Sequence, residues 1–169
     1  LKDFNSLINI SSNLIGVHLE GPFINPKKLG AQPDLTIKPS IEFINKINEI
    51  ADIKTITLAP EIEGMEKFIP FLIDQNINVQ FGHTLADSKT CEKYMTSNDI
   101  SFTHLYNAMS DNHHRNPGVL SSALNNGAEN CFAANDLPDP TAPKIETTFI
   151  FLKNLLLLHQ HLALYYAKY

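Results

Sequence analysis

The sequence predicts an α/β fold in which a parallel sheet of about six strands is covered by helices. Short apolar, β-branched runs alternate with amphipathic helical segments, the pattern of repeated β-α units. Polar side chains follow several of these runs, where the carboxyl ends of parallel strands meet. The chain has 169 residues, whereas a complete (β/α)8 barrel needs about 200 or more. We therefore expect a partial barrel or a smaller open sheet.

The first half of the chain contains three predicted strands and two predicted helices. The strands are the mainly apolar runs 14–20, 53–58 and 77–81. A loop rich in Pro, Gly, Lys and Asn, residues 21–38, leads to a helix that Pro39 can open. The second helix carries an apolar stripe from Met65 to Leu72. Pro70 interrupts this stripe and predicts a late start or a kink, because proline lacks the N–H that an inner helical position uses.

The second half continues the alternation. Asp87 can cap a helix that runs to about Thr96, because its carboxylate can accept a hydrogen bond from a backbone N–H of the first turn. Further strands are predicted at 100–104, 131–134 and 155–158, and further helices at 116–124 and 142–153.

Composition and charge exclude several classes of function. A net charge of −5 argues against a general nucleic-acid surface. The longest apolar run, residues 155–158, is too short to span a bilayer. Cys91 and Cys131 form no disulfide framework, so we expect two reduced thiols in a cytoplasmic protein. We expect no signal peptide, because the first residues lack a basic start and an apolar core, and the missing initial Met suggests a fragment.

One carboxylate and two imidazoles are the candidate metal ligands. Glu20, His83 and His104 each end or closely follow a predicted strand. A catalytic zinc ion takes such oxygen and nitrogen ligands and keeps one position for water, whose pKa it lowers to about 7. A single histidine at a strand end is more often structural, but the repeated placement favours a metal site. His18 shares a strand face with Glu20 and is either a partner of this site or a core histidine.

Five sequence motifs follow one another between residues 14 and 124. They read GVHLEGPFINP with KLGA, then LAPE, GHT, THLYNAM and HHRNPG. Together they closely resemble the N-acetylglucosamine-6-phosphate deacetylases of the amidohydrolase superfamily. The resemblance implies a TIM-type barrel and one divalent metal ion, with zinc expected first and iron, manganese or cobalt as alternatives. It also implies hydrolysis of N-acetylglucosamine 6-phosphate to glucosamine 6-phosphate and acetate, by an enzyme that is a homodimer when intact.

The resemblance assigns roles to single residues. Glu20, His83 and His104 correspond to the metal ligands. The residues that correspond to substrate contacts are Ala31, Gln32, Asn107, Ala108 and, for the phosphate, Arg115. Gln32 stands where the family usually has histidine, so this contact can still donate a hydrogen bond but cannot carry charge.

The end of the chain departs from the family pattern. The family's general acid/base is an Asp after a later strand, and the alignment puts Gln160 or His161 there. Gln does not titrate near neutral pH, whereas His161 could, with a different geometry. Asp139 stands where a substrate-contacting histidine is expected. We therefore expect the chain to bind metal but to turn over poorly or not at all.

The expected organisation is a single partial-barrel domain over residues 1–169. Within it, residues 14–124 are family-like and residues 125–169 form a divergent tail, while N-terminal strands and a flanking β-sandwich are absent. Two other functions stay open. One is a related amidohydrolase acting on another small amide, which the Asn107 and Arg115 pair argues against. The other is a non-catalytic remnant that binds a sugar phosphate or a partner.

Overall fold

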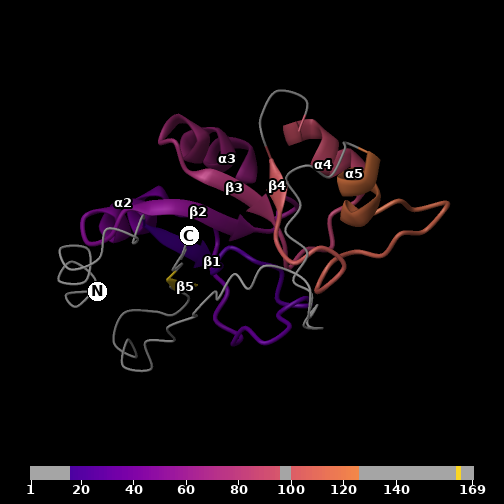
Figure 1. Ribbon diagram of the computed structural model, residues 1–169, viewed down its shortest axis with the longest axis horizontal. Helices are drawn as coiled ribbons and strands as arrows, with labels where there is room; N and C mark the ends of the chain where they lie inside the picture. Colours follow the sequence, from indigo (N-terminus) through magenta and orange to yellow (C-terminus); the bar gives the residue numbers. More distant parts are fainter. Residues whose placement is uncertain (1–15, 96–99, 126–162, 165–169) are drawn as a thin grey trace, which may run out of the picture.

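The computed structural model describes residues 16–95 and 100–125, together with the backbone of 163–164. Within these residues, a sheet with strand order β4-β3-β2-β1-β5 is covered by helices (Figure 1). The parallel strands are β1 (Val17–Glu20), β2 (Ile53–Leu58), β3 (Asn78–Phe81) and β4 (Ser101–Phe102). This confirms the α/β class with a parallel sheet. A fifth strand, β5 (Ala163–Leu164), pairs antiparallel with β1, which the all-parallel expectation did not include.

The two faces of the parallel sheet differ in chemistry because side chains alternate along a strand. One face is apolar and packs into the core with the helices; it includes Leu19, Ile56, Leu58, Val79, Phe81 and Phe102. The opposite face carries His18, Glu20, Thr57, Gln80 and Ser101, and strand register sets Glu20 beside Thr57 and Thr57 beside Gln80. The polar face therefore places ligands and hydrogen-bonding groups together at one end of the sheet.

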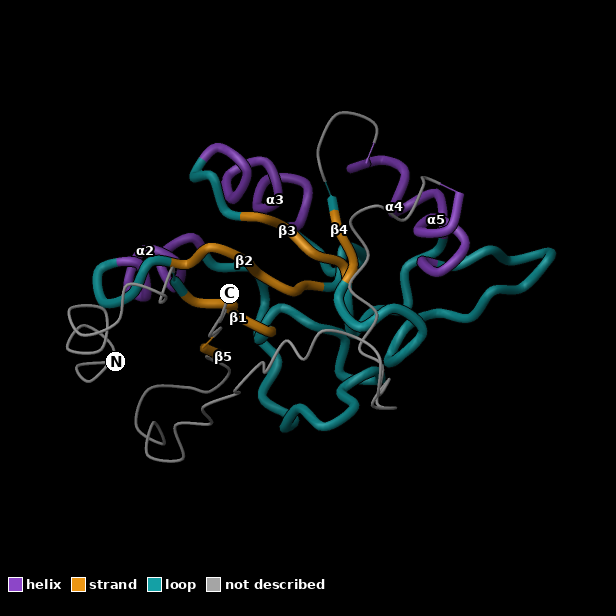
Figure 2. Tube along the Cα trace, viewed as in Figure 1, coloured by secondary structure: helices purple, strands orange, loops and turns teal. Residues whose placement is uncertain are grey.

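The helices are α2 (Ile41–Asn48), α3 (Met65–Asp74), α4 (Ser88–Met95) and α5 (Val119–Asn125). Figure 2 shows α2 and α3 away from the loops that follow the strands, whereas α4 and α5 lie next to those loops. The apolar stripe predicted on α3 is buried at Met65, Phe68, Ile69 and Leu72. None of the helices in the described ranges is long and apolar enough to cross a membrane.

Several predicted element bounds needed correction. Pro39 does not open α2, because Ser40 has an extended backbone and its Oγ caps the helix by accepting from Phe43 N at 3.2 Å. Of the two alternatives predicted for α3, a late start is excluded, because this helix begins at Met65 and includes Pro70, and a kink at Pro70 stays a prediction. The cap at Asp87 is confirmed, since its Oδ1 accepts from Thr90 N at 2.8 Å.

Two elements beyond α4 are shorter than predicted. β4 ends at Phe102, so His104 lies in the turn after the strand and not within it. α5 begins only at Val119, because bridges Asn112↔Pro117 and Asp87↔Gly118 hold the preceding residues in an extended hairpin. The predicted elements 131–134, 142–153 and 155–158 lie outside the described residues.

Candidate metal centre

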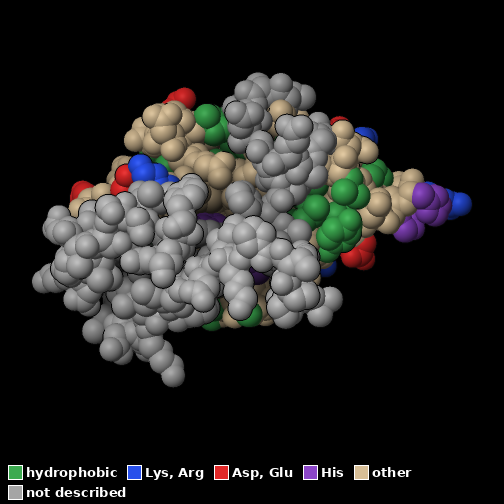
Figure 3. All heavy atoms as spheres, in the orientation of Figure 1, with side chains coloured by type: hydrophobic (Ala, Val, Ile, Leu, Met, Phe, Trp, Pro, Cys, Tyr) green, Lys and Arg blue, Asp and Glu red, His purple; other side chains and the backbone are tan. Residues whose placement is uncertain are grey.

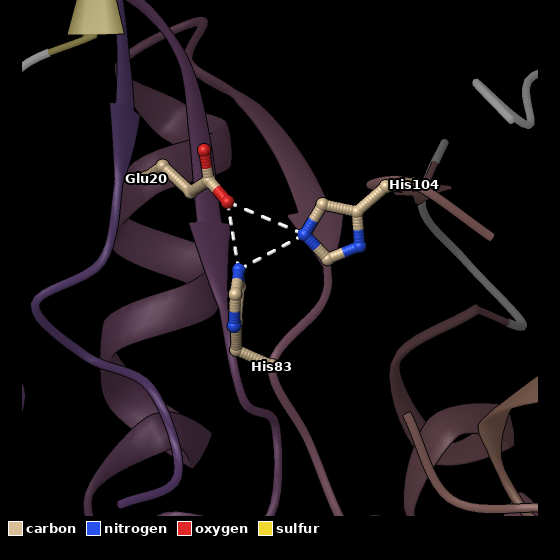
Figure 4. Close-up of side chains that lie close together, drawn as sticks. All are labelled: Glu20, His83 and His104. Atoms are coloured by element: carbon tan, nitrogen blue, oxygen red, sulfur yellow. Dashed lines mark hydrogen bonds and ion pairs between the residues drawn. The ribbon is translucent and has the colours of Figure 1, made fainter. Parts of the chain in front are cut away.

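The three predicted metal ligands converge at the carboxyl ends of the parallel strands (Figure 4). Glu20 ends β1, while His83 and His104 follow β3 and β4 by two residues. Glu20 Oε1 lies 2.7 Å from His83 Nε2 and 3.3 Å from His104 Nε2, and the two Nε2 atoms are 2.9 Å apart. Side chains from three separate segments therefore meet at one point.

Backbone carbonyl groups fix which nitrogen of each imidazole faces this point. His83 Nδ1 lies 2.8 Å from the carbonyl oxygen of Lys28, and His104 Nδ1 lies 3.1 Å from that of Asn107. A carbonyl oxygen only accepts, so each Nδ1 must carry a hydrogen. In a neutral ring, Nε2 then presents its lone pair. Two imidazole lone pairs and a carboxylate oxygen thus face one another, an arrangement that requires a proton or a cation between them.

The electrostatics of the centre favour a positive charge beside Glu20. Burial alone would raise the pKa of Glu20, but hydrogen bonds from His104 and His83 outweigh it and hold the pKa of this carboxyl well below its usual range. Burial alone would lower the pKa of His104, but its hydrogen bond and charge attraction to Glu20 raise that pKa overall. Glu20 is therefore an anion at neutral pH and attracts whichever cation is present.

The donor set fits a zinc-type ion. The three ligand atoms all lie within 4.8 Å of one another, and bonds of about 2.1 Å to a tetrahedral ion would place ligand atoms about 3.4 Å apart. The side chains of Glu20, His83 and His104 are 17%, 4% and 18% exposed, so the centre is largely shielded from water but not sealed. Three protein ligands leave a position for a further ligand.

The backbone around the centre contains unusual left-handed conformations. Positive φ angles at or near the ligands occur at His83 (50°), His104 (34°), Tyr106 (80°) and Ala108 (50°). Each such conformation costs a non-glycine residue about 1 kcal/mol or more and persists only where the surroundings impose it. The clustering of this strain at the ligands and in the turn after β4 is typical of a functional site.

Comparison with known proteins shows which enzymes the chain resembles. No protein-family model matches the chain. The N-acetylglucosamine-6-phosphate deacetylase of Bacillus subtilis (strain 168) is 45% identical over 118 residues, which are 68% of this chain and 30% of that protein. The chain is a homologue of part of the N-acetylglucosamine-6-phosphate deacetylases. The resemblance drawn from the five motifs is thereby confirmed.

Solved N-acetylglucosamine-6-phosphate deacetylases share the fold of the described region. The enzyme from Pasteurella multocida superposes with a TM-score of 0.64 at 29% identity, over 72% of this chain and 33% of that chain. A mutant of the Mycobacterium smegmatis enzyme, in complex with N-acetyl-D-glucosamine-6-phosphate, superposes with a TM-score of 0.56 at 29% identity. That match covers 63% of this chain and 28% of the mutant enzyme. The chain thus spans about a third of the length of the deacetylases it matches.

Four of the five residues that correspond to deacetylase substrate contacts lie on two loops beside His83. Ala31 and Gln32 belong to the loop after β1, and Asn107 and Ala108 to the turn after β4. The two loops meet at Gly30, where an added Cβ would lie 3.5 Å from His83 Cε1 and 3.8 Å from Ala108 Cβ. The structure therefore places the two loops that carry these four residues beside the candidate metal centre.

The structure places Arg115 elsewhere. It lies on the hairpin between β4 and α5, which projects from the body of the molecule (Figure 1). The tip of this hairpin carries exposed histidine and arginine side chains (Figure 3). No hydrogen bond or ion pair joins the Arg115 side chain to another residue in the described ranges. Gln160, His161 and Asp139 lie outside those ranges.

Sequence reasoning assigned no role to Glu61, which joins the loop after β1 to the segment that directly follows His83. Its Oε1 accepts from Asn25 Nδ2 at 2.8 Å and from Leu85 N at 2.7 Å, and its Oε2 accepts from Thr84 Oγ1 at 2.5 Å. The signal available was the LAPE motif at the end of β2, which puts a carboxylate at a strand terminus. This carboxylate holds the loops in place, whereas Glu20 faces the imidazoles.

Proposed function

We propose that Glu20, His83 and His104 hold one divalent metal ion in a site that recognises N-acetylglucosamine 6-phosphate. Zinc is the first expectation, because it accepts two imidazoles with one carboxylate, and iron, manganese and cobalt are alternatives. The observation that carries this proposal is the convergence of two Nε2 lone pairs and a carboxylate oxygen, with both Nδ1 atoms committed to carbonyl groups. Homology to the deacetylases supplies the substrate class.

The proposed reaction is hydrolysis of the acetamide, which consumes one water and yields acetate and glucosamine 6-phosphate. When bound, a divalent ion supplies Lewis-acid chemistry by polarising a carbonyl group and activating water. The chain's own contribution is orientation. The carbonyl groups of Lys28 and Asn107 keep the imidazoles turned toward Glu20, and the partial burial of all three ligands limits competition from bulk water.

The loops around the centre are the proposed sugar-phosphate contacts. Ala31, Gln32, Asn107 and Ala108 belong to the two loops that meet beside His83, and these loops can offer backbone and amide groups to a sugar. We assign the phosphate to Arg115 from the family resemblance, since its guanidinium suits bidentate phosphate binding. Its exposed side chain has no partner in the described residues, which leaves its donors open to a ligand.

A second candidate function is binding without turnover. The alignment puts Gln160 or His161 where the family has its acid/base Asp, and Gln cannot exchange a proton near neutral pH. We also propose that residues 14–124 are the family-like part of one partial-barrel domain, with 125–169 as a divergent tail. The 118-residue match to the Bacillus subtilis enzyme and the four parallel strands support this division.

The test compares N-acetylglucosamine 6-phosphate with N-acetylglucosamine on the zinc-loaded chain, using calorimetry for binding and an acetate assay for turnover. We expect the phosphorylated sugar to bind at least about tenfold more tightly, because charge-assisted phosphate contacts contribute about 1.5–3 kcal/mol. Glu63→Gln serves as a control and should leave binding intact, because it changes an exposed carboxylate outside the centre. Equal affinity for the two sugars would contradict the proposed substrate class. Acetate release above the metal-free rate would favour the enzyme over the binding-only candidate.

A further inference from the structure

A continuous string of hydrogen bonds crosses the polar face of the sheet beneath the metal centre. It runs from His18 Nε2 to Thr57 Oγ1 at 2.7 Å, from there to Thr103 Oγ1 at 2.6 Å, and on to Gln80 Oε1 at 2.7 Å. All four side chains are buried, none more than 7% exposed. We propose that this hydroxyl string is a positioning device, which sets the spacing of the three metal ligands and thereby the affinity of the centre.

The string has a single direction because each threonine hydroxyl has one hydrogen. Thr103 gives its hydrogen to the Gln80 oxygen, so Thr103 can only accept from Thr57. Thr57 has then used its own hydrogen, so it must accept from the N–H of His18. Every link therefore depends on the next, and loss of one hydroxyl disrupts the whole string.

The string touches all three ligand-bearing segments. His18 lies two residues before Glu20 on β1, and Thr103 directly precedes His104. The segment that carries His83 is reached through Gly82, where an added Cβ would lie 2.8 Å from Thr57 Cγ2 and 3.0 Å from Thr103 Cβ. The backbone before His83 thus rests against the two threonines. A change in the separation of Thr57 and Thr103 would move Glu20, His83 and His104 relative to one another.

Direct hydrogen bonds suit this task better than apolar packing. The interior of a (β/α)8 barrel is usually filled with branched apolar side chains, whose contacts tolerate small shifts. Hydrogen bonds of 2.6–2.7 Å fix both length and direction. Polar groups behind metal ligands commonly change metal affinity by about 10–100-fold when they are removed. The hydroxyl string would support all three ligands, Glu20, His83 and His104, and not one ligand alone.

The role of the hydroxyl string rests on the proposed metal centre. The experiment below distinguishes a failure of the string's role from a failure of the metal centre. Thr103→Val removes the hydroxyl at nearly constant shape, and Thr103→Ser restores it. Thr55→Val is the matched control, because Thr55 lies on the same strand as Thr57 and takes no part in the string. Three quantities are measured for each variant. They are the zinc dissociation constant, obtained by chelator competition, the visible spectrum of the cobalt-loaded chain, and the melting temperature in EDTA.

We expect Thr103→Val to weaken zinc binding by about 10–100-fold and to alter the cobalt spectrum. Thr103→Ser and Thr55→Val should both bind zinc within about threefold of the wild type. If Thr103→Val does not fold, Gln80→Met removes the last acceptor and should give the same loss. Wild-type zinc affinity and an unchanged cobalt spectrum in a folded Thr103→Val or Gln80→Met chain would overturn the string inference alone. Failure of the wild type to bind zinc would overturn the metal centre itself.

Discussion

The imidazoles of His83 and His104 are oriented by carbonyl groups of the backbone, from Lys28 and Asn107. Their orientation therefore depends on the paths of two loops and not on a partner side chain that one substitution could remove. Glu61 holds the first of these loops against residues 84 and 85. At the scale of single residues, the geometry of the candidate metal centre thus depends on the paths of the two loops as well as on the identity of the three side chains.

The reactivity of the Cys91 thiol shows whether the core around α4 is folded. It is fully buried on α4, and burial raises the pKa of its thiol to about 12, with the charge of Glu61 adding to the effect. Since the thiolate is the reactive form, a buried thiol with a raised pKa is inert. In the unfolded chain the thiol ionises near its ordinary pKa, so raising the pH above about 9 favours unfolding.

We therefore predict that a Cys131→Ser chain is not alkylated by iodoacetamide at pH 8.5 while folded, but is alkylated fully in urea. Lys89→Cys combined with Cys91→Ala and Cys131→Ser provides the control, because position 89 is exposed on the same helix. That control should react in the folded state. Rapid labelling of Cys91 in the folded chain would mean that the core around α4 is not as described.

The convergence of the three candidate ligands could be predicted from sequence, whereas the groups that support them could not. Glu20, His83 and His104 stand out because a carboxylate and two imidazoles recur at the ends of three separate apolar runs. A carbonyl group looks the same at every residue, so the roles of Lys28 and Asn107 leave no mark in the sequence. Thr57 and Thr103 are separated by 46 positions, and only the strand order brings them together.

At the scale of elements, strand interiors were easier to predict than element ends. β2 has the predicted bounds, because its run is rich in β-branched isoleucine and threonine. The start of α2 was misplaced, since Pro39 and Ser40 both fit a helix terminus and only the capping bond of Ser40 decides between them. β4 is shorter than its apolar run, because the turn that carries His104 begins immediately after Phe102.

The cap on α2 gives a prediction at this scale. Ser40→Ala removes the oxygen that accepts from Phe43 N, so we expect the free energy of unfolding to fall by about 1 kcal/mol. Urea denaturation measures this loss. Ser40→Asp keeps a capping oxygen and should retain most of the wild-type stability. If Ser40→Ala and Ser40→Asp were equally stable, the capping bond would contribute nothing to α2.

At the scale of the whole molecule, the four parallel strands follow from the β-α alternation, because a crossover helix brings the chain back in the same direction. The same order gathers three strand ends at one edge of the sheet, which is why ligands far apart in sequence meet. β5 could not be foreseen, because its two residues carry too little pattern to define a strand. The described region thus contains the candidate metal centre and the loops around it.

The central claim is that the chain binds one divalent ion through Glu20, His83 and His104. Its most direct test is elemental analysis of the purified chain after zinc loading and gel filtration, for wild type, Glu20→Gln and Glu63→Gln. We expect about one zinc per chain in the wild type and in Glu63→Gln, whose exposed carboxylate lies outside the centre. Glu20→Gln should retain far less, because it removes the anionic ligand. Equal zinc content in the wild type and Glu20→Gln would contradict the claim.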